Sequence, residues 1–150
     1  METFDRLDCG APGAVDVAVT LPWERRTRSR QRVTLDDGNE ALLALPRGTV
    51  LRHGDVLRGA CGGQLRVMAA AETVSTAHAE DGTSLLRAAY HLGNRHVAVE
   101  IGAGWLRYLH DHVLDDMVRG LGLTVAVEQA PFEPEAGAYA SGHGHGHGHD

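Results

Sequence analysis

Lysine is absent from the sequence, cysteine occurs only twice, and aromatic residues make up only 5% of the 150 residues. Cys9 and Cys61 lie far apart and form no C-x-x-C pattern, which excludes a zinc knuckle and a paired redox site. The longest apolar runs fall far short of the roughly 20 residues that a membrane span requires. Met1–Gly10 also lacks the apolar stretch of a secretory signal. We therefore expect a reduced, cytoplasmic protein that does not bind a membrane.

Positive charge is also scarce. All 14 basic residues are arginine, and the net charge is −6 with histidine neutral. A general nucleic-acid-binding protein should carry a positive excess, so we expect no nucleic-acid partner. The sequence contains no G-x-S-x-G, P-loop, H-E-x-x-H or Gly-rich dinucleotide motif. We therefore expect a protein that is not an enzyme.

The first half of the sequence has the pattern of short strands separated by tight turns. Val15–Leu21 alternates apolar and polar residues, which is the period of a half-buried strand. The turn at residues 36–39 contains an Asp-Gly pair between two apolar runs, and this pattern predicts a hairpin. Further short apolar runs follow at residues 49–51, 56–57 and 65–68. We expect residues 1–70 to form a small all-β domain, a sandwich or a barrel.

The second half alternates between helical and extended patterns. Apolar residues at helical spacing predict one helix that starts after Asp81 and ends at Gly93-Asn94 in a left-handed cap. A second apolar stripe, from Val113 to Leu121, predicts another helix. Strands are expected near residues 68–75, 97–101, 105–109 and 125–127.

The resulting order is β-α-β-β-α-β, so we assign residues 71–132 to an α+β domain with the ferredoxin-like arrangement. From Pro131 onward the chain contains glycine and proline and has no apolar periodicity. Residues 133–150 are therefore expected to form a disordered, His-rich tail.

Histidine is the residue whose abundance needs an explanation, since nine of the ten histidines lie after position 70. Four of them alternate with glycine in the tail: His143, His145, His147 and His149. Imidazole suits Ni(II), Cu(II) and Zn(II), and the glycines leave the backbone free to fold around an ion. A purification tag is the alternative, although tags are usually contiguous histidines. Composition alone does not separate nickel from copper or zinc.

Other histidines are candidate ligands because of their spacing. His110 and His112 would lie on one face of an extended segment, although Asp111 between them could instead cap the following helix. His96 follows the expected helix end and supplies a single ligand, so a site there needs partners, and symmetric dimerisation could provide a second copy. His91, near the helix end, can interact with the helix dipole. His53 and His78 have no companions, and we interpret them as ordinary surface residues.

Two charged runs have alternative interpretations. The arginine-dense segment Arg25–Arg32 could bind an anionic partner, but a solvated strand edge protected from aggregation by its charge is the simpler interpretation. Asp115 and Asp116 resemble a carboxylate pair. Because adjacent helical residues diverge by about 100°, we expect both to lie on the wet face of the second helix.

Several strings in both halves of the chain occur together in one known family: Arg30–Arg32, Leu45–Leu51, Gly54–Leu57, Ala89–His96, His110–Met117 and Pro131–Tyr139. In these strings the sequence closely resembles the UreE family of urease accessory proteins, the nickel chaperones of urease maturation. The resemblance implies an N-terminal domain similar to a co-chaperone's peptide-binding module. It also implies a homodimer joined through the ferredoxin-like domains.

The resemblance also assigns roles to the histidines. His96 of each subunit would meet at the dimer interface and ligate Ni(II). His110 and His112 match an additional, more peripheral metal site, and the tail histidines match a variable metal-gathering extension. The implied partners are the urease-associated GTPase and, through it, the apo-urease complex.

Three functions follow as hypotheses. The first is capture of Ni(II) and its delivery for assembly of the urease active site. The second is a passive metal store or buffer in which the tail does the binding, although four histidines are few for storage. The third is a metal-independent assembly scaffold that acts through the β domain.

Overall fold

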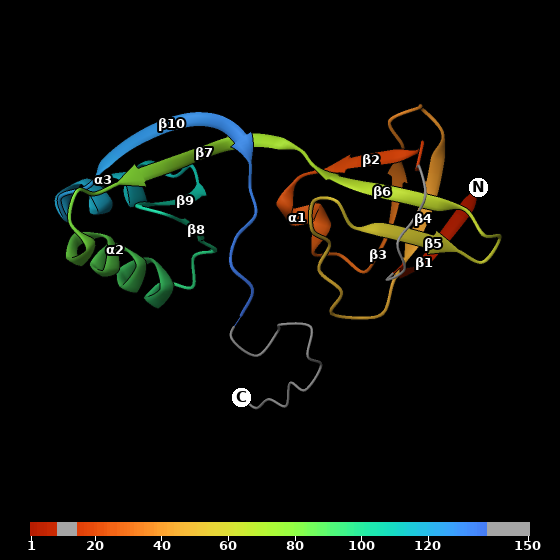
Figure 1. The fold of residues 1–150 in the computed structure, drawn as a ribbon, viewed down its shortest axis with the longest axis horizontal. Helices are drawn as coiled ribbons and strands as arrows, with labels where there is room; N and C mark the ends of the chain where they lie inside the picture. Colours follow the sequence, from red (N-terminus) through yellow and green to blue (C-terminus); the bar gives the residue numbers. More distant parts are fainter. Residues whose placement is uncertain (9–14, 138–150) are drawn as a thin grey trace. The chain divides into compact units, whose positions relative to one another are not determined.

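The computed structural model describes residues 1–8 and 15–137, and the chain divides into two compact units, Met1–Glu72 and Thr73–Asp150 (Figure 1). The sequence placed this boundary two residues earlier. The longest helix in the described ranges, α2, has 13 residues. No helix there is both long enough and apolar enough to span a membrane.

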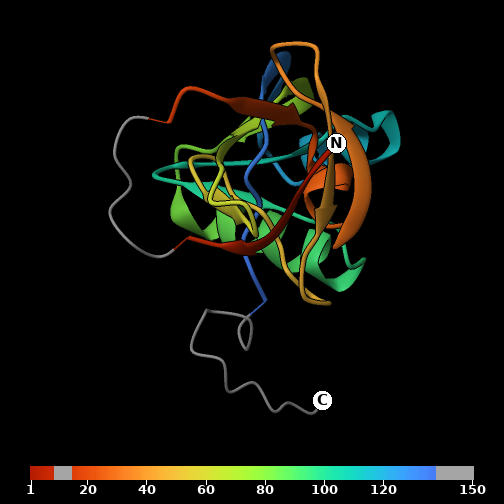
Figure 2. The same cartoon turned by 90° about the vertical axis from the view of Figure 1, so that its right-hand side faces the viewer.

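The first unit contains one six-stranded mixed sheet. Its strands are β1 (Glu2–Leu7), β2 (Ala18–Leu21), β3 (Arg30–Thr34), β4 (Glu40–Ala44), β5 (Val56–Gly59) and β6 (Gln64–Ala69). They are ordered β2-β6-β5-β1-β4-β3, with β1/β4 and β2/β6 parallel and the other pairs antiparallel (Figures 1 and 2). Alternate residues of the strands, such as Leu65 and Val67, are fully buried in an aliphatic core.

Local patterns predicted part of this sheet. The expected hairpin is confirmed, because β3 and β4 pair antiparallel across a turn in which Gly38 has a φ of 92°. The expected strand at residues 49–51 is wrong, since that segment is irregular. β1 was not predicted, although it lies between β5 and β4. Phe4 is its only buried residue, so its alternation is weak.

The arginine-dense segment combines the expected edge with a buried residue. β3 is an edge strand, and Arg30 and Arg32 are exposed on it. Arg26, however, lies in the short helix α1 (Trp23–Arg26) and is 0% exposed. Its Nε donates to the carbonyl of Leu21 (3.1 Å) and its guanidinium also donates to the carbonyl of Leu51 (3.3 Å). The interpretation as a solvated edge is therefore wrong for Arg26, which joins the end of β2 to the irregular segment at Leu51.

The second unit follows the order β7-α2-β8-β9-α3-β10. Its elements are β7 (Ala71–His78), α2 (Gly82–Asn94), β8 (Glu100–Gly102), β9 (Trp105–Leu109), α3 (His112–Gly120) and β10 (Thr124–Pro131). The sheet order is β10-β7-β9-β8, with β9 antiparallel to both β7 and β8. Ala77, Leu106 and Tyr108 pack with the helix residues Leu92 and Val118 in the core. The expected element order is confirmed, although the strand predicted at 68–75 divides between β6 and β7.

Both helices are capped by aspartates, Asp81 as expected and Asp111 in the role that the sequence offered as an alternative. The Asp81 carboxylate accepts a hydrogen bond from the Ser84 N–H (2.7 Å), and this bond holds the pKa of Asp81 below its ordinary value of 3.8. The Asp111 carboxylate accepts from the N–H groups of Val113 (2.8 Å) and Leu114 (3.2 Å). These bonds satisfy donors that a helix N-terminus otherwise leaves unpaired.

Residues 132–135, here named the C-terminal strap, continue from β10 and contact the opposite edge strand. Phe132 is 0% exposed, and the Glu133 N–H donates to the Glu100 carboxylate (2.9 Å). The Glu135 N–H donates to the carbonyl of Val99, just before β8 (2.7 Å). The sequence placed residues 133–135 in a disordered tail. That prediction is wrong for the strap, because its order depends on contacts with a distant strand and not on local periodicity.

Candidate metal centre

His96 lies at the C-terminal end of α2, in a backbone conformation that usually belongs to glycine. Its φ is 59°, and its N–H donates to the carbonyl of Gly93 (2.9 Å). The next residue, Val97, donates to the carbonyl of Leu92 (3.1 Å). This pair of bonds is the Schellman motif, in which the left-handed position is most often glycine. The left-handed residue is thus His96 and not Gly93 or Asn94, which continue the helix.

The His96 side chain is exposed, and within residues 1–8 and 15–137 no hydrogen bond or ion pair engages its ring. A left-handed conformation costs a non-glycine residue roughly 1–2 kcal/mol. Such strain commonly persists at functional positions, where the side chain is needed. The ring is therefore presented to solvent as one available nitrogen ligand.

His110 lies just after β9 and is held by a buried polar network. Its Nδ1 lies 3.1 Å from Asp115 Oδ2 and 3.1 Å from Ser75 Oγ. The Tyr108 hydroxyl donates to the other carboxylate oxygen, Asp115 Oδ1 (2.7 Å). Asp115 is 2% exposed, whereas the His110 side chain is 37% exposed. The network therefore connects a partly exposed imidazole with the core of the second unit.

The buried end of this network keeps its tyrosine neutral. Burial, together with the hydrogen bond to Asp115, raises the pKa of Tyr108 above its ordinary value of 10.0. The expectation that both aspartates lie on the wet face of α3 is therefore wrong for Asp115, while Asp116 is exposed as expected. Asp115 lies three residues before the buried Val118, and this helical spacing was the available sequence signal.

His112 is exposed and is the first residue of α3, so it does not continue the extended segment of His110. The alternative role of Asp111, as the cap of the helix, is the one that the structure contains. The argument that placed His110 and His112 on one face of a strand is therefore wrong. They remain candidate ligands as two exposed rings two residues apart.

Among the remaining described histidines, the rings of His91 and His53 contact neighbouring groups. The His91 ring lies edge-to-face against Tyr90, with 5.2 Å between centroids, in the last turn of α2. His53 Nδ1 accepts a hydrogen bond from the Ala69 N–H (3.0 Å), so this ring fastens a loop to β6. His78 ends β7 and is exposed.

The four tail histidines, His143, His145, His147 and His149, lie outside the described residues. The structure does describe the strap, which precedes them in the sequence. The strap holds Glu135 against Val99, three residues after His96 in the sequence. The chain that leads to the tail is thus fixed beside the segment that carries His96.

The described residues of one chain do not contain a complete ligand set. Within the described ranges, no group of three or more histidine, cysteine, aspartate or glutamate side chains could hold an ion. Structural metal sites usually use four protein ligands and open sites three. Because His96 supplies one nitrogen, further ligands must come from another chain, from the tail or from solvent.

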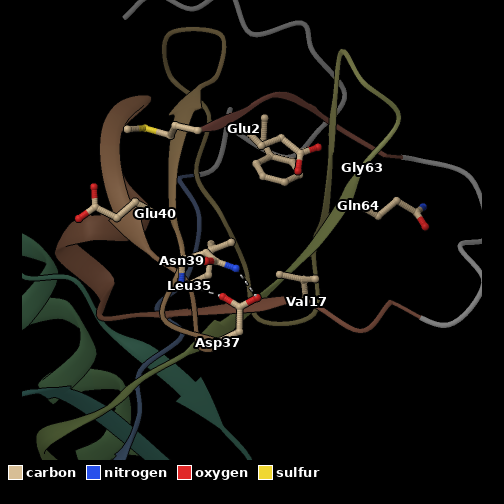
Figure 3. A pocket seen from close by; sticks show the side chains of 10 residues that line it. Glu2, Val17, Leu35, Asp37, Asn39, Glu40, Gly63 and Gln64 are labelled. Atoms are coloured by element: carbon tan, nitrogen blue, oxygen red, sulfur yellow. Dashed lines mark hydrogen bonds between the residues drawn. The ribbon is translucent and has the colours of Figure 1, made fainter.

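A pocket of the first unit has no histidine among its lining residues. It measures about 640 Å³ and combines apolar residues with the carboxylates of Glu2, Asp37 and Glu40 (Figure 3). Asp37 is already engaged by Asn39, whose N–H and side-chain amide both donate to its carboxylate. The carboxylates of the cavity do not form a metal-holding group.

Comparisons with known proteins agree with the resemblance in the sequence. Residues 4–70 match the family model "UreE urease accessory protein, N-terminal domain", and residues 72–150 match the corresponding C-terminal domain model. A relative from Alkalilimnicola ehrlichii is 60% identical over 135 residues, covering 90% of this chain and 82% of the relative.

Two further relatives are comparably similar, and all three are named urease accessory protein UreE. The relative from Pseudomonas putida (strain W619) is 64% identical over 124 residues, covering 82% of this chain and 77% of the relative. The relative from Vibrio parahaemolyticus is 56% identical over 135 residues, covering 90% and 80%. The chain therefore belongs to the UreE family of urease accessory proteins.

Proposed function

We propose that this protein is a nickel-binding metallochaperone that captures Ni(II) through histidines and delivers it for assembly of the urease active site. The observation that carries the proposal is the position of His96. An exposed imidazole occupies a strained glycine position at the end of α2, in a member of the urease accessory family. Its nitrogen is a suitable donor for Ni(II).

The proposed working form is a homodimer of ferredoxin-like domains in which the two His96 residues share one ion. Strand order β10-β7-β9-β8 supports that domain type, because it places the last strand beside the first and the third between first and second. The surface of α2 supports a second copy: Leu86 and Tyr90, four residues apart on one face, are 72% and 68% exposed. Apolar side chains exposed together in this way mark interaction surfaces. A two-fold interface would bring identical residues together.

Two histidine nitrogens leave the other positions of the ion open, and this property suits delivery by ligand exchange. We propose that His110 and His112 form a peripheral site and that His143, His145, His147 and His149 collect ions. The contact of the strap with Val99 supports transfer from the tail toward His96, because it fixes the start of the tail nearby. Cu(II) and Zn(II) would bind the same nitrogens, since imidazole accepts all three ions.

Family membership supports the proposed partners. The curated relatives are named urease accessory proteins, so the acceptor would be the urease maturation machinery. We propose the urease-associated GTPase as the direct partner, with the apo-urease complex beyond it, in the cytoplasm. The proposed role is that of a carrier and not of an enzyme.

Isothermal calorimetry with Ni(II) tests the assignment to His96. The comparison uses full-length protein in which the four tail histidines are alanine, with and without His96→Ala, and with His78→Ala as the matched exposed control. We expect His96→Ala to abolish the tightest binding event and His78→Ala to leave it unchanged. Undiminished affinity in the His96 variant would sink the proposal. If the tail substitutions alone abolish all binding, the protein is a metal store.

A further inference from the structure

The carboxylate of Asp115 makes two directed contacts that the proposed nickel chemistry does not by itself require. One oxygen accepts the Tyr108 hydroxyl (2.7 Å), and the other lies 3.1 Å from His110 Nδ1. The aspartate is 2% exposed, although it is on a helix whose neighbouring aspartate faces water. A buried carboxylate is costly unless hydrogen-bond donors satisfy it. We therefore assign the Tyr108 hydroxyl and the His110 Nδ1–H as hydrogen-bond donors to Asp115.

The geometry also assigns the proton of the His110 ring. A neutral imidazole carries one proton, on either Nδ1 or Nε2. If Nδ1 were unprotonated, its lone pair would face a carboxylate oxygen at 3.1 Å, and the buried oxygen would lack a donor. If Nδ1 is protonated, it donates to Asp115 and the contact is favourable. Ser75 fits the same arrangement, because its hydroxyl oxygen lies 3.1 Å from Nδ1 and can also accept from it.

We propose that Asp115 is a positioning residue for His110: it fixes the proton on Nδ1 and so leaves the exposed Nε2 as the donor for a divalent cation. This inference rests on the proposed function only in treating His110 as a ligand. Hydrogen bonds from the second nitrogen of a ligating histidine orient the ring and make it a stronger ligand. Asp115 thus connects a surface metal ligand to the folded core through Tyr108.

Asp115→Asn is a sharp perturbation because it preserves the size of the side chain. The Tyr108 hydroxyl still donates to the amide oxygen, which places the NH₂ group toward His110 Nδ1. That NH₂ donates, so Nδ1 must accept and the ring proton moves to Nε2. The substitution therefore places a proton on the nitrogen that would bind the ion. Asp116→Asn, one residue away and exposed, is the matched control.

Nitrogen-15 NMR of the histidine side chains reads the tautomer directly in full-length, metal-free protein at mildly alkaline pH, with His110 assigned through a His110→Gln variant. We expect the proton on Nδ1 in the wild type and in Asp116→Asn, and on Nε2 in Asp115→Asn. A proton on Nε2 in the wild type would overturn the proposal without any variant. An unchanged tautomer in Asp115→Asn would also overturn it.

Titration with Zn(II) alone, a diamagnetic ion, then tests whether His110 Nε2 binds a divalent cation and with what affinity. The background is full-length protein with alanine at His96 and at the four tail histidines. We expect the His110 Nε2 signal to shift with Zn(II), and Asp115→Asn to weaken this binding about 10- to 100-fold. No shift at Nε2, or equal affinity in Asp115→Asn and Asp116→Asn, would contradict the inference. The proposed function fails by a separate result, undiminished nickel affinity after His96→Ala, which leaves the His110 tautomer untouched.

Discussion

Tyr108→Phe removes one hydroxyl from the core of the second unit and leaves the aromatic ring in place. In the wild type this hydroxyl donates to the buried Asp115 carboxylate at 2.7 Å, and Tyr108 is 0% exposed. A hydrogen bond to a charged group contributes about 1.5–3 kcal/mol. We expect the substitution to lower the free energy of unfolding of this unit by that amount at neutral pH. Tyr90→Phe, at an exposed ring, should change it by less than about 0.5 kcal/mol.

The same substitution should remove a pH dependence. Because the folded-state pKa of Tyr108 is raised above 10.0, its contribution to stability is complete below pH 10.0. Above pH 10.0 the unfolded chain releases the proton while the folded chain retains it. Wild-type stability should then fall by about 1.4 kcal/mol per pH unit through this group. Phenylalanine has no such proton, so the difference between the two proteins should shrink as pH rises.

Urea denaturation followed by the methyl NMR signals of Leu106 and Val118 measures this unit alone, because both residues lie in its core. A Tyr108→Phe protein within about 0.5 kcal/mol of the wild type at neutral pH would refute the reasoning. So would parallel alkaline profiles of the two proteins.

Three further substitutions have expected outcomes. Arg26→Met should destabilise the first unit by about 2–4 kcal/mol in urea denaturation, because two buried carbonyls lose a charged donor; a change below about 1 kcal/mol would mean that the guanidinium is dispensable. His96→Gly should raise the free energy of unfolding of the second unit by about 0.5–1 kcal/mol, because it removes the strain of a left-handed histidine. The same substitution should abolish tight nickel binding. A lower free energy of unfolding would contradict the strain argument. Asp111→Ala should cost about 1 kcal/mol and accelerate hydrogen exchange at the amides of Val113 and Leu114, and unchanged exchange would argue against the cap.

The sequence predicted those elements whose signals are local. The two helices of the second unit were predicted, because each has an apolar stripe and because Asp81 and Asp111, which could cap them, lie at the helix starts. The β3–β4 hairpin was predictable for the same reason, since its turn carries an Asp-Gly pair.

The elements that sequence reasoning missed depend on distant partners. Arg26 and Asp115 are charged residues whose burial is compensated by groups that the fold brings to them. The strap has no periodicity of its own, yet Phe132 is fully buried and the Glu133 and Glu135 N–H groups donate to Glu100 and Val99. β1 is held between two strands that lie far along the chain. Long-range compensation of this kind leaves no regular spacing in the sequence.

For the candidate metal site, too, the sequence predicted some features and missed others. Histidine abundance indicated metal, and family resemblance selected His96. Spacing placed the left-handed helix end at Gly93-Asn94, because glycine and asparagine are the usual residues there. The Schellman bonds instead place His96 in that position. Sequence periodicity could not reveal that a histidine occupies this strained position, which usually holds glycine.

Nickel stoichiometry tests the central claim most directly. Full-length protein with alanine at the four tail histidines is equilibrated with micromolar Ni(II), and its tightly bound metal and its mass in solution are determined together. If paired His96 residues hold one ion, the tight site should contain one nickel per two chains, and the protein should be dimeric. One tight nickel per chain, or none, would contradict the account.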